Sequence, residues 1–122
     1  MTHKLIVKDK FHPKPSGRLP IHSPDANGQL FRTTVLRRAL DSYPHVTIDF
    51  TGIDLVGASF LDEAIAGLIY HDDFTEQQVR SRIDLVIPAD PTKVDTAWEW
   101  VRQAGEKMRS RPIRKQPEVA AY

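Results

Sequence analysis

The residues best suited to chemistry lie in the stretch GASFLDEA, residues 57–64. A strand-like apolar run precedes this stretch and a helical pattern follows it, so Ser59 is expected where an extended segment turns into a helix. A serine at such a turn lies near unpaired backbone N–H groups and is accessible to a kinase. Ser59 and Asp62 also have the S-x-x-D spacing of a capping box, in which the serine oxygen accepts a hydrogen bond from the first helical turn. Capping alone accounts for Ser59, so the sequence leaves both roles open.

Two acidic residues beside Ser59 bear on its phosphorylation. Asp62 and Glu63 are favoured in the first helical turn, where the helix dipole is positive. They would repel a phosphoryl group, which carries about −1.5 to −2 charges, and no arginine in the neighbouring sequence offsets them. A phosphorylated Ser59 is therefore expected to break a contact with a partner rather than to make one.

A hydrolase turn of the G-x-S-x-G type is only half present. Gly57 and Ser59 match it, but Leu61 stands where close backbone packing needs the second glycine. A catalytic triad also requires a correctly placed histidine. The histidines are scattered along the chain: His3, His12, His22, His45 and His71. We therefore expect a protein that is not an enzyme, with a small hydrolase or a nucleotide-binding protein as less favoured alternatives.

Other acidic residues suggest metal or acid–base chemistry. His71, Asp72 and Asp73 are of metal-ligating types, but adjacent residues rarely all point to one ion, so a solvated helix end is favoured. Asp49 and Asp54 bracket a turn and could act as paired carboxylates. For Asp49 we favour a turn role, in which its side chain accepts backbone hydrogen bonds. There is no glycine-rich phosphate loop, and we expect neither a cofactor nor a metal.

The elements that would position these residues alternate between strand and helix. Residues 4–8, 46–50 and 83–88 have strand patterns, and the nearly all-apolar last run indicates a central strand. Residues 18–22 form a weaker candidate, which Pro20 would confine to a sheet edge. The apolar residues Ile53, Leu55 and Val56 are expected to line the floor of the core.

Helical periodicity covers four segments. Residues 28–43 carry an apolar stripe that leaves the arginines, among them Arg32, mostly outside it, and Tyr43-Pro44 should end that helix. A second helix begins at Ser59. Thr75 and Gln78 form a capping box for a short helix over 76–82. Asp90 and Pro91 suit the N-cap and first position of the last helix.

These elements predict an α/β fold. We expect a sandwich with a small mixed or parallel four-stranded sheet, covered by three to four helices and joined by right-handed crossovers. With 122 residues, 40% of them hydrophobic, one domain over 1–110 is expected, followed by a flexible basic tail over 111–122.

Charge and composition narrow the class of partner. The net charge is only +1, and basic ends flank an acidic middle, so nucleic-acid binding is not expected. No run approaches the roughly 18 apolar residues that a membrane span needs. The sequence has no cysteine, which excludes disulfides and thiolate catalysis. A cytoplasmic protein without membrane contact is the expectation.

Residues 28–70 resemble the STAS-like domain family of unknown function, found in bacteria and phages. The resemblance is carried by Phe31-Arg32 on a helix, by the strand VTIDF (46–50), and by SFLDEA (59–64) at the next helix start. It implies a STAS-like fold and a regulatory domain that acts through contacts with another protein.

More distantly, the chain is similar to STAS domains of anti-sigma factor antagonists. In those domains an anti-sigma kinase phosphorylates a serine in a D-S-S-G-type motif, and phosphorylation releases the partner. Counted from Asp49, the phosphorylated serine falls on Ala58 and its neighbour on Ser59, while Gly57 and Phe60 replace the aspartate and the glycine. The similarity implies a histidine-kinase-like ATPase or an anti-sigma-type kinase as partner, and the motif differs at three of four positions.

The sequence thus predicts a non-catalytic interaction module that binds a protein through the turn and helix start at 54–63, or else an antagonist regulated by phosphorylation of Ser59. Trp100 lies off the apolar stripe of the last helix and is either an interface anchor or a ring packed sideways. A second copy of the chain is a further candidate partner. The candidate contact residues are Asp54, Gly57, Ala58, Ser59, Phe60, Asp62, Glu63 and Trp100.

Overall fold

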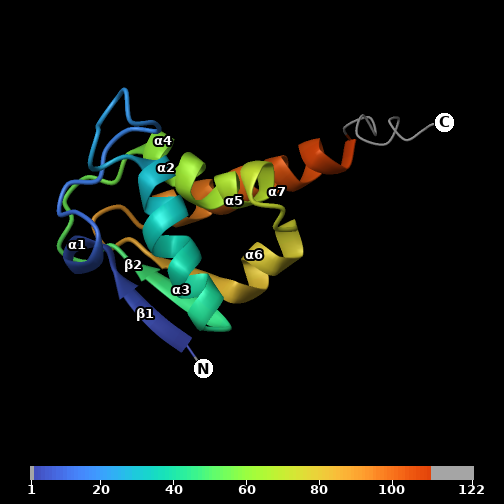
Figure 1. Cartoon of the computed structure of the whole chain (residues 1–122), viewed down its shortest axis with the longest axis horizontal. Helices are drawn as coiled ribbons and strands as arrows, with labels where there is room; N and C mark the ends of the chain where they lie inside the picture. Colours follow the sequence, from blue (N-terminus) through green and yellow to red (C-terminus); the bar gives the residue numbers. More distant parts are fainter. Residues whose placement is uncertain (1, 111–122) are drawn as a thin grey trace.

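The computed structural model describes residues 2–110 and contains one parallel sheet. Its strands are β1 (Thr2–Ile6), β2 (His45–Asp49) and β3 (Ile83–Val86), in the order β1-β2-β3 (Figure 1). The sheet therefore has three strands within the described chain, and the prediction of four was wrong. The fold class, α/β, is confirmed.

Residues 18–22, the expected fourth strand, form turns instead. The backbone N–H of His22 donates to the carbonyl of Leu19, and the N–H of Leu19 donates to His22 Nδ1. These local bonds occupy the groups that a strand would need for pairing with the sheet. The expectation that 83–88 is central was also wrong, because β3 is an edge strand whose burial alternates along its length.

The described residues form five helices. The short α1 (Val7–Lys10) follows β1 directly. One continuous helix over 28–42 consists of α2 (Gly28–Leu30), the π-helical η1 (Phe31–Leu36) and α3 (Arg37–Ser42). A second, over 58–71, consists of α4 (Ala58–Leu61), the π-helical η2 (Asp62–Ala66) and α5 (Gly67–His71). The last two are α6 (Glu76–Arg82) and α7 (Thr92–Ser110).

Several helix ends confirm their sequence signals. Tyr43 is extended before Pro44 and ends the helix over 28–42. The capping box of α6 is formed as predicted, since Thr75 Oγ1 accepts from the Gln78 N–H and Gln78 Oε1 accepts from the Thr75 N–H. The last helix begins at Thr92, one residue after the predicted first position at Pro91.

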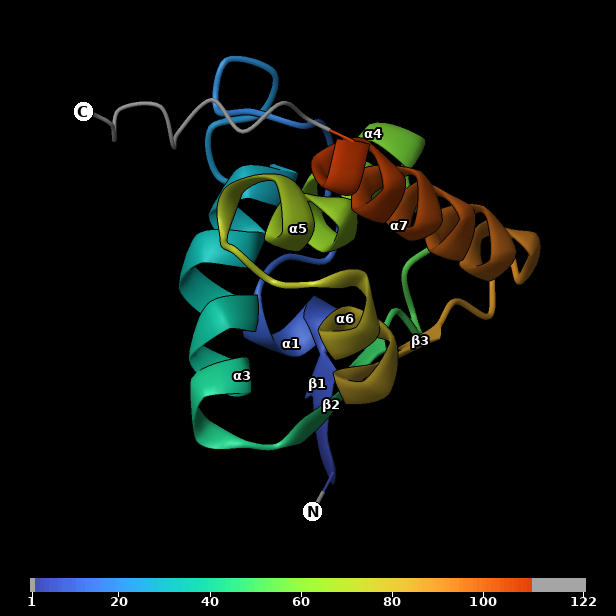
Figure 2. The same cartoon turned by 90° about the vertical axis from the view of Figure 1, so that its right-hand side faces the viewer.

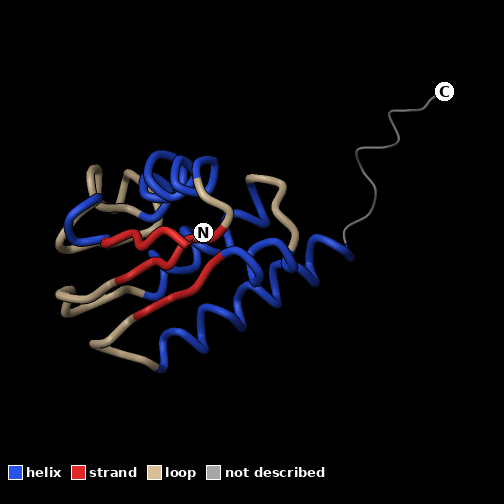
Figure 3. The backbone as a smooth tube through the Cα atoms, turned by 90° about the horizontal axis from the view of Figure 1, so that it is seen from below, coloured by secondary structure: helices blue, strands red, loops and turns tan. Residues whose placement is uncertain are grey.

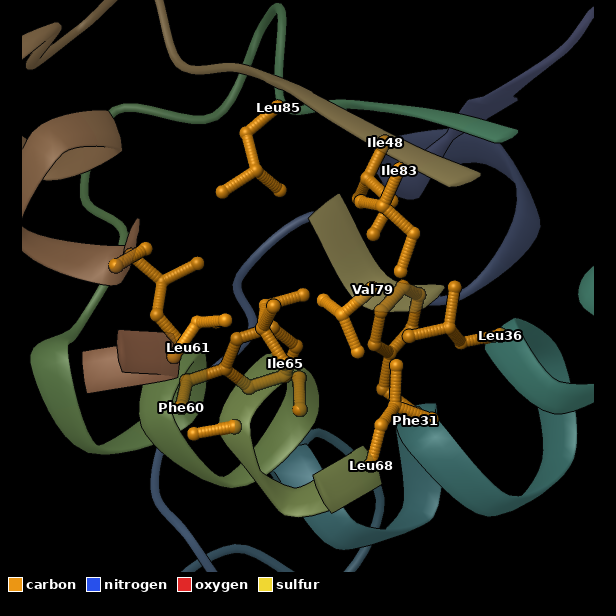
Figure 4. Close-up of a cluster of buried hydrophobic side chains, with 14 of the residues drawn as sticks. Phe31, Leu36, Ile48, Phe60, Leu61, Ile65, Leu68, Val79, Ile83 and Leu85 are labelled. Atoms are coloured by element: carbon orange, nitrogen blue, oxygen red, sulfur yellow. The ribbon is translucent and has the colours of Figure 1, made fainter. Parts of the chain in front are cut away.

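The core lies between the sheet and the helices. Buried aliphatic side chains of β2 and β3 meet aromatic and aliphatic side chains of the helices over 28–42 and 58–71 (Figure 4). The rings of Phe31 and Phe60, one from each helix, lie with centroids 5.6 Å apart, and Phe11 packs edge-on against Phe31. This aromatic contact holds the two long helices together above the strands.

The helices are arranged on one side of the sheet. The helix over 28–42 and α6 contact the strands, while α7 packs on the helix over 58–71 and on α6 (Figures 1 and 2). Seen from below, the three strands lie side by side (Figure 3), and alternate strand residues, such as Leu5, Ile48 and Leu85, are buried against the helices. The fold is therefore a two-layer sandwich with one covered sheet face.

The predicted tail, 111–122, falls outside the described residues. The expected domain boundary at 110 therefore stays a prediction. Among residues 2–110, no helix is long and apolar enough to cross a membrane.

Candidate functional site

The segment between β2 and the next helix is tied down at both ends. Asp49 Oδ1 accepts hydrogen bonds from the backbone N–H and the hydroxyl of Thr51, at 2.9 and 2.6 Å, which confirms the predicted turn role of Asp49. At the other end, Lys93 Nζ on α7 donates to the carbonyl of Val56 at 2.6 Å. The loop is therefore held in a fixed position although it has no regular structure.

Within this loop, apolar side chains point in opposite directions. Ile53 and Val56 are buried, as expected for the floor of the core. Leu55, which was expected beside them, is 75% exposed instead, so that prediction was wrong. The buried side chains of Ile53 and Val56 anchor the loop backbone on either side, and Leu55 points into solvent next to the exposed Asp54.

The helix that follows begins before Ser59. Its N-cap is Gly57, with extended backbone angles of φ −71° and ψ 146°, and no side chain caps it. The prediction that Ser59 caps the helix through a box with Asp62 was therefore wrong. The helix starts one residue earlier, at Ala58, so Ser59 lies inside the first turn with an exposed side chain.

The two acids beside Ser59 are paired with arginines that are distant in sequence. Arg18 Nη1 lies 2.9 Å from Asp62 Oδ2 and 3.8 Å from Glu63 Oε1. Arg32 Nη1 lies 2.7 Å from Glu63 Oε2. The expectation that no arginine offsets these acids holds only for the local sequence and is corrected by the fold.

Arg32 is the centre of a buried ionic cluster. Its side chain is only 3% exposed, and its Nη1 donates to both the backbone carbonyl and the carboxylate of Glu63. Its Nε donates to Asp72 Oδ2 at 2.9 Å, and Arg37 Nη1 contacts the other oxygen of Asp72 at 3.2 Å. Arg32 was expected outside the apolar stripe, and its position here links the helix over 28–42 to η2 and to the C-cap of the helix over 58–71.

Small residues let the two helices approach this closely. A Cβ at Gly67 would clash with the Arg32 guanidinium, and a Cβ at Gly28 would lie 2.7 Å from the carbonyl oxygen of Phe60. The facing segments, η1 and η2, are both π-helical. π-Helical turns often occur at functional sites, and here they place Arg32 and Glu63 against each other.

The predicted contact residues divide into exposed and buried groups. Asp54, Ala58 and Ser59 are exposed, whereas Gly57 and Asp62 are half-buried. Phe60 is fully buried in the aromatic core and Glu63 is buried in the ionic cluster, so their side chains are not accessible to a partner in this conformation. Trp100 is half-buried on α7 and packs against the edge of the core.

The candidate metal residues do not converge. Asp72 is taken by Arg32 and Arg37, while His71 and Asp73 are exposed. Asp72 is therefore neither a metal ligand in this arrangement nor part of a solvated helix end. In residues 2–110 no group of three or more acidic or histidine side chains is placed to hold a metal ion.

A hollow between α6 and α7 lies away from the loop. Phe74 and Met108 contribute to its lining, together with Glu76, Arg80 and Arg109. The hydrogen bond from Arg80, helped by Arg109, keeps the pKa of Glu76 below its ordinary value despite the opposing effect of burial. Glu76 thus pairs with Arg80 within α6 and with Arg109 across to α7, so these charges join the two helices.

Sequence reasoning missed three residues of the site. Leu55 was assigned to the core, Arg32 was placed outside the apolar stripe of its helix, and Arg18 was given no role. The pairing of Arg32 with Glu63 had a weak signal, since both lie in the runs that carry the resemblance. Arg18 had none, because its partner Asp62 lies 44 positions away.

The fold and the site together define a small α/β domain. Its anchored, solvent-exposed loop follows β2 and leads into the helix over 58–71. A family model described as the STAS-like domain of unknown function (DUF4325) matches residues 27–91, which is 65 of the 122 residues. The chain belongs to this family. No curated protein and no solved structure matches the chain.

Proposed function

We propose that this domain is a non-catalytic interaction module that binds another protein through the loop and helix start at 54–59. The observation that carries the proposal is the position of Leu55, which is 75% exposed on a segment anchored by its buried neighbours. The backbone that carries Leu55 is already fixed by its buried neighbours and by the Lys93 hydrogen bond, which lowers the entropic cost of ordering the loop on association.

The chemistry of this surface indicates what its partner should offer. Leu55 requires an apolar pocket, and the exposed Asp54 beside it favours a basic residue at the rim. The exposed Ala58 and Ser59 continue the surface onto the helix without bulk. The distant similarity to anti-sigma factor antagonists supports a histidine-kinase-like ATPase or an anti-sigma-type kinase as the partner.

Phosphorylation of Ser59 is the second candidate, and one observation favours it. The Ser59 side chain is exposed and does not cap the helix, so a kinase would reach it without unfolding the turn. Asp62 is held by Arg18 and Glu63 by Arg32, which reduces the repulsion expected from the sequence. Intact-mass measurement after incubation with ATP and a co-encoded kinase, with Ser59→Ala alongside, decides this candidate.

The interaction proposal is tested by replacing Leu55. Leu55→Asp removes the apolar contact and places a charge in the expected pocket, so the affinity for the product of a neighbouring kinase-like gene should fall at least about 30-fold, as for a hot-spot residue. The dissociation constant is measured by isothermal titration calorimetry.

Gln77→Asp provides the matched control, because Gln77 is exposed on α6 at the far end of the molecule from the loop (Figure 1). It adds the same charge and should leave affinity within about twofold of wild type. Equal binding by the wild-type and Leu55→Asp proteins would show that this loop is not the contact surface.

A further inference from the structure

The outer face of the sheet is uncovered in the described chain. The strands pair in register, so Lys4, Thr47 and Asp84 form one row across the sheet, and Ile6, Asp49 and Val86 form the next. The alternate residues, such as Leu5, Ile48 and Leu85, point into the core and are buried. In the outer rows Lys4, Asp84 and Val86 are exposed, and Ile6 and Thr47 are half-buried.

An uncovered face is unusual for this kind of sheet. Purely parallel sheets occur almost only with both faces covered, because the crossover connections between parallel strands place helices on both faces. Here Val86 is 39% exposed and belongs to the small set of exposed large apolar residues. Ile6 lies at the other end of the same row. The outer face thus has apolar positions at both edges and nothing packed on it within residues 2–110.

The charges at the two edges of this face are arranged so that they complement each other. Lys4 lies on the β1 edge and Asp84 on the β3 edge of one row, roughly 10 Å apart across two strand spacings. Asp84 Oδ2 also lies 3.4 Å from His45 Nε2 in its own chain, but the Asp84 side chain stays 67% exposed. A two-fold axis parallel to β2 and just outside the sheet places the β1 edge of one copy over the β3 edge of the other. Each Lys4 then faces the Asp84 of the second copy, and each Ile6 faces its Val86.

We propose that the outer sheet face binds a second copy of this chain in this strand-parallel orientation. The alternative two-fold axis, perpendicular to the strands, places Lys4 over Lys4 and Asp84 over Asp84, which like-charge repulsion disfavours. In the strand-parallel arrangement Asp49 faces Asp49, but this side chain is 6% exposed and bonds to Thr51 within its own chain.

The size of the face sets the expected strength. Three strands of four or five residues offer a face of roughly 250 Å² in projection, well below the ~800 Å² per partner of a standard interface. The self-association is therefore weak and concentration-dependent. It uses a different surface from the loop at 54–59, so it is independent of the proposed partner contact.

Charge exchange tests the proposal by sedimentation velocity on the full chain, from about 10 μM to about 1 mM, a range suited to weak association. The wild type should self-associate over this range. Lys4→Asp alone and Asp84→Lys alone each place like charges opposite one another at two symmetric positions, and each should weaken association at least tenfold. Mixing the two variants pairs opposite charges again and should restore association as a heterodimer.

Control variants on α7, Lys107→Asp and Asp95→Lys, make the same charge changes at exposed positions away from the sheet and should associate like wild type. A wild type that stays monomeric throughout the range would overturn the proposal. Unchanged association of both single variants would also overturn it, because the interface would then lie elsewhere. A mixture of two folded variants that fails to associate would exclude this orientation.

Discussion

At the scale of single residues, the most consequential side chain is Arg32. It carries a full charge at 3% exposure and contacts a carboxylate on each side, Glu63 and Asp72. A planar guanidinium has donors that point in several fixed directions, whereas a lysine ammonium is a point charge on a flexible stem. One arginine therefore joins two acids that lie nine positions apart on the facing helix.

Replacement of Arg32 should strongly destabilise the domain. Arg32→Met keeps most of the buried volume but leaves Glu63 buried without its main partner, which costs about 3 to 5 kcal/mol for a broken buried ion pair. Asp72 keeps Arg37, so the loss falls chiefly on Glu63. The free energy of unfolding, measured by urea denaturation, provides the test.

Two further variants sharpen this test. Glu63→Gln in the Arg32→Met background removes the buried charge that has lost its main partner and should recover part of the lost stability. Arg38→Met, at an exposed position of the same helix, should change the free energy of unfolding by no more than about 0.5 kcal/mol. Equal effects of Arg32→Met and Arg38→Met would contradict a stabilising role for the cluster.

Single residues were also where prediction from the sequence failed most. A hydrophobic pattern assigns every charge to the surface, so the burial of Arg32 required knowledge of two acids and a glycine on another helix. Leu55 failed for the opposite reason. An irregular loop has no repeating geometry from which to infer which of three apolar side chains points outward.

At the scale of elements, the start of the helix over 58–71 determines how Ser59 is presented. Gly57 already has the extended conformation of an N-cap, so the chain enters the helix before reaching the serine. The Ser59 side chain is exposed, and no side chain caps this helix. The same geometry that removes the capping role from Ser59 makes its hydroxyl accessible.

Replacement by alanine should affect the stability of the domain differently at Ser59 and at Thr75, which both lie at helix starts. Ser59→Ala removes no cap and introduces a better helix former, so stability should be unchanged or slightly raised. Thr75→Ala removes a cap that is formed in the structure and should cost about 1 kcal/mol. Thermal and urea denaturation of both variants provide the comparison. A loss of about 1 kcal/mol in Ser59→Ala would restore the serine as the cap.

Prediction of elements succeeded where periodicity or local chemistry determines the structure. The helix over 76–82 and its capping box were predicted from Thr75 and Gln78 alone, and the helix end at Tyr43 from the following proline. Strand position within the sheet was not predictable in this way. The run IDLVIP indicated a central strand, but β3 lies at the sheet edge, and its alternate residues are exposed because they face the uncovered side of the sheet.

At the scale of the whole molecule, the loop and the outer sheet face form two separate surfaces. The loop that contains Leu55 lies at the carboxyl ends of the parallel strands. The outer sheet face is the side of the strands turned away from the helices, at the bottom of the molecule in Figure 1 and toward the viewer in Figure 3. A strand-parallel two-fold axis keeps the strand directions of both copies the same. The loops of the two copies, with Leu55 on each, would then face the same direction and could engage a dimeric partner together.

The absence of cysteine from the chain allows this arrangement to be probed at one chosen position. Thr47 lies at the middle of the outer face, on the expected two-fold axis, so a small trifluoromethyl label on Thr47→Cys should enter a drier environment as copies associate. Its ¹⁹F chemical shift should therefore change with protein concentration, and Lys4→Asp should move that change to at least tenfold higher concentration. The same label on Thr33→Cys, at an exposed position of η1 in the opposite helical layer, should be insensitive to concentration. A concentration-dependent shift at position 33 but not at 47 would place self-association on the helical side and contradict the assignment of the sheet face.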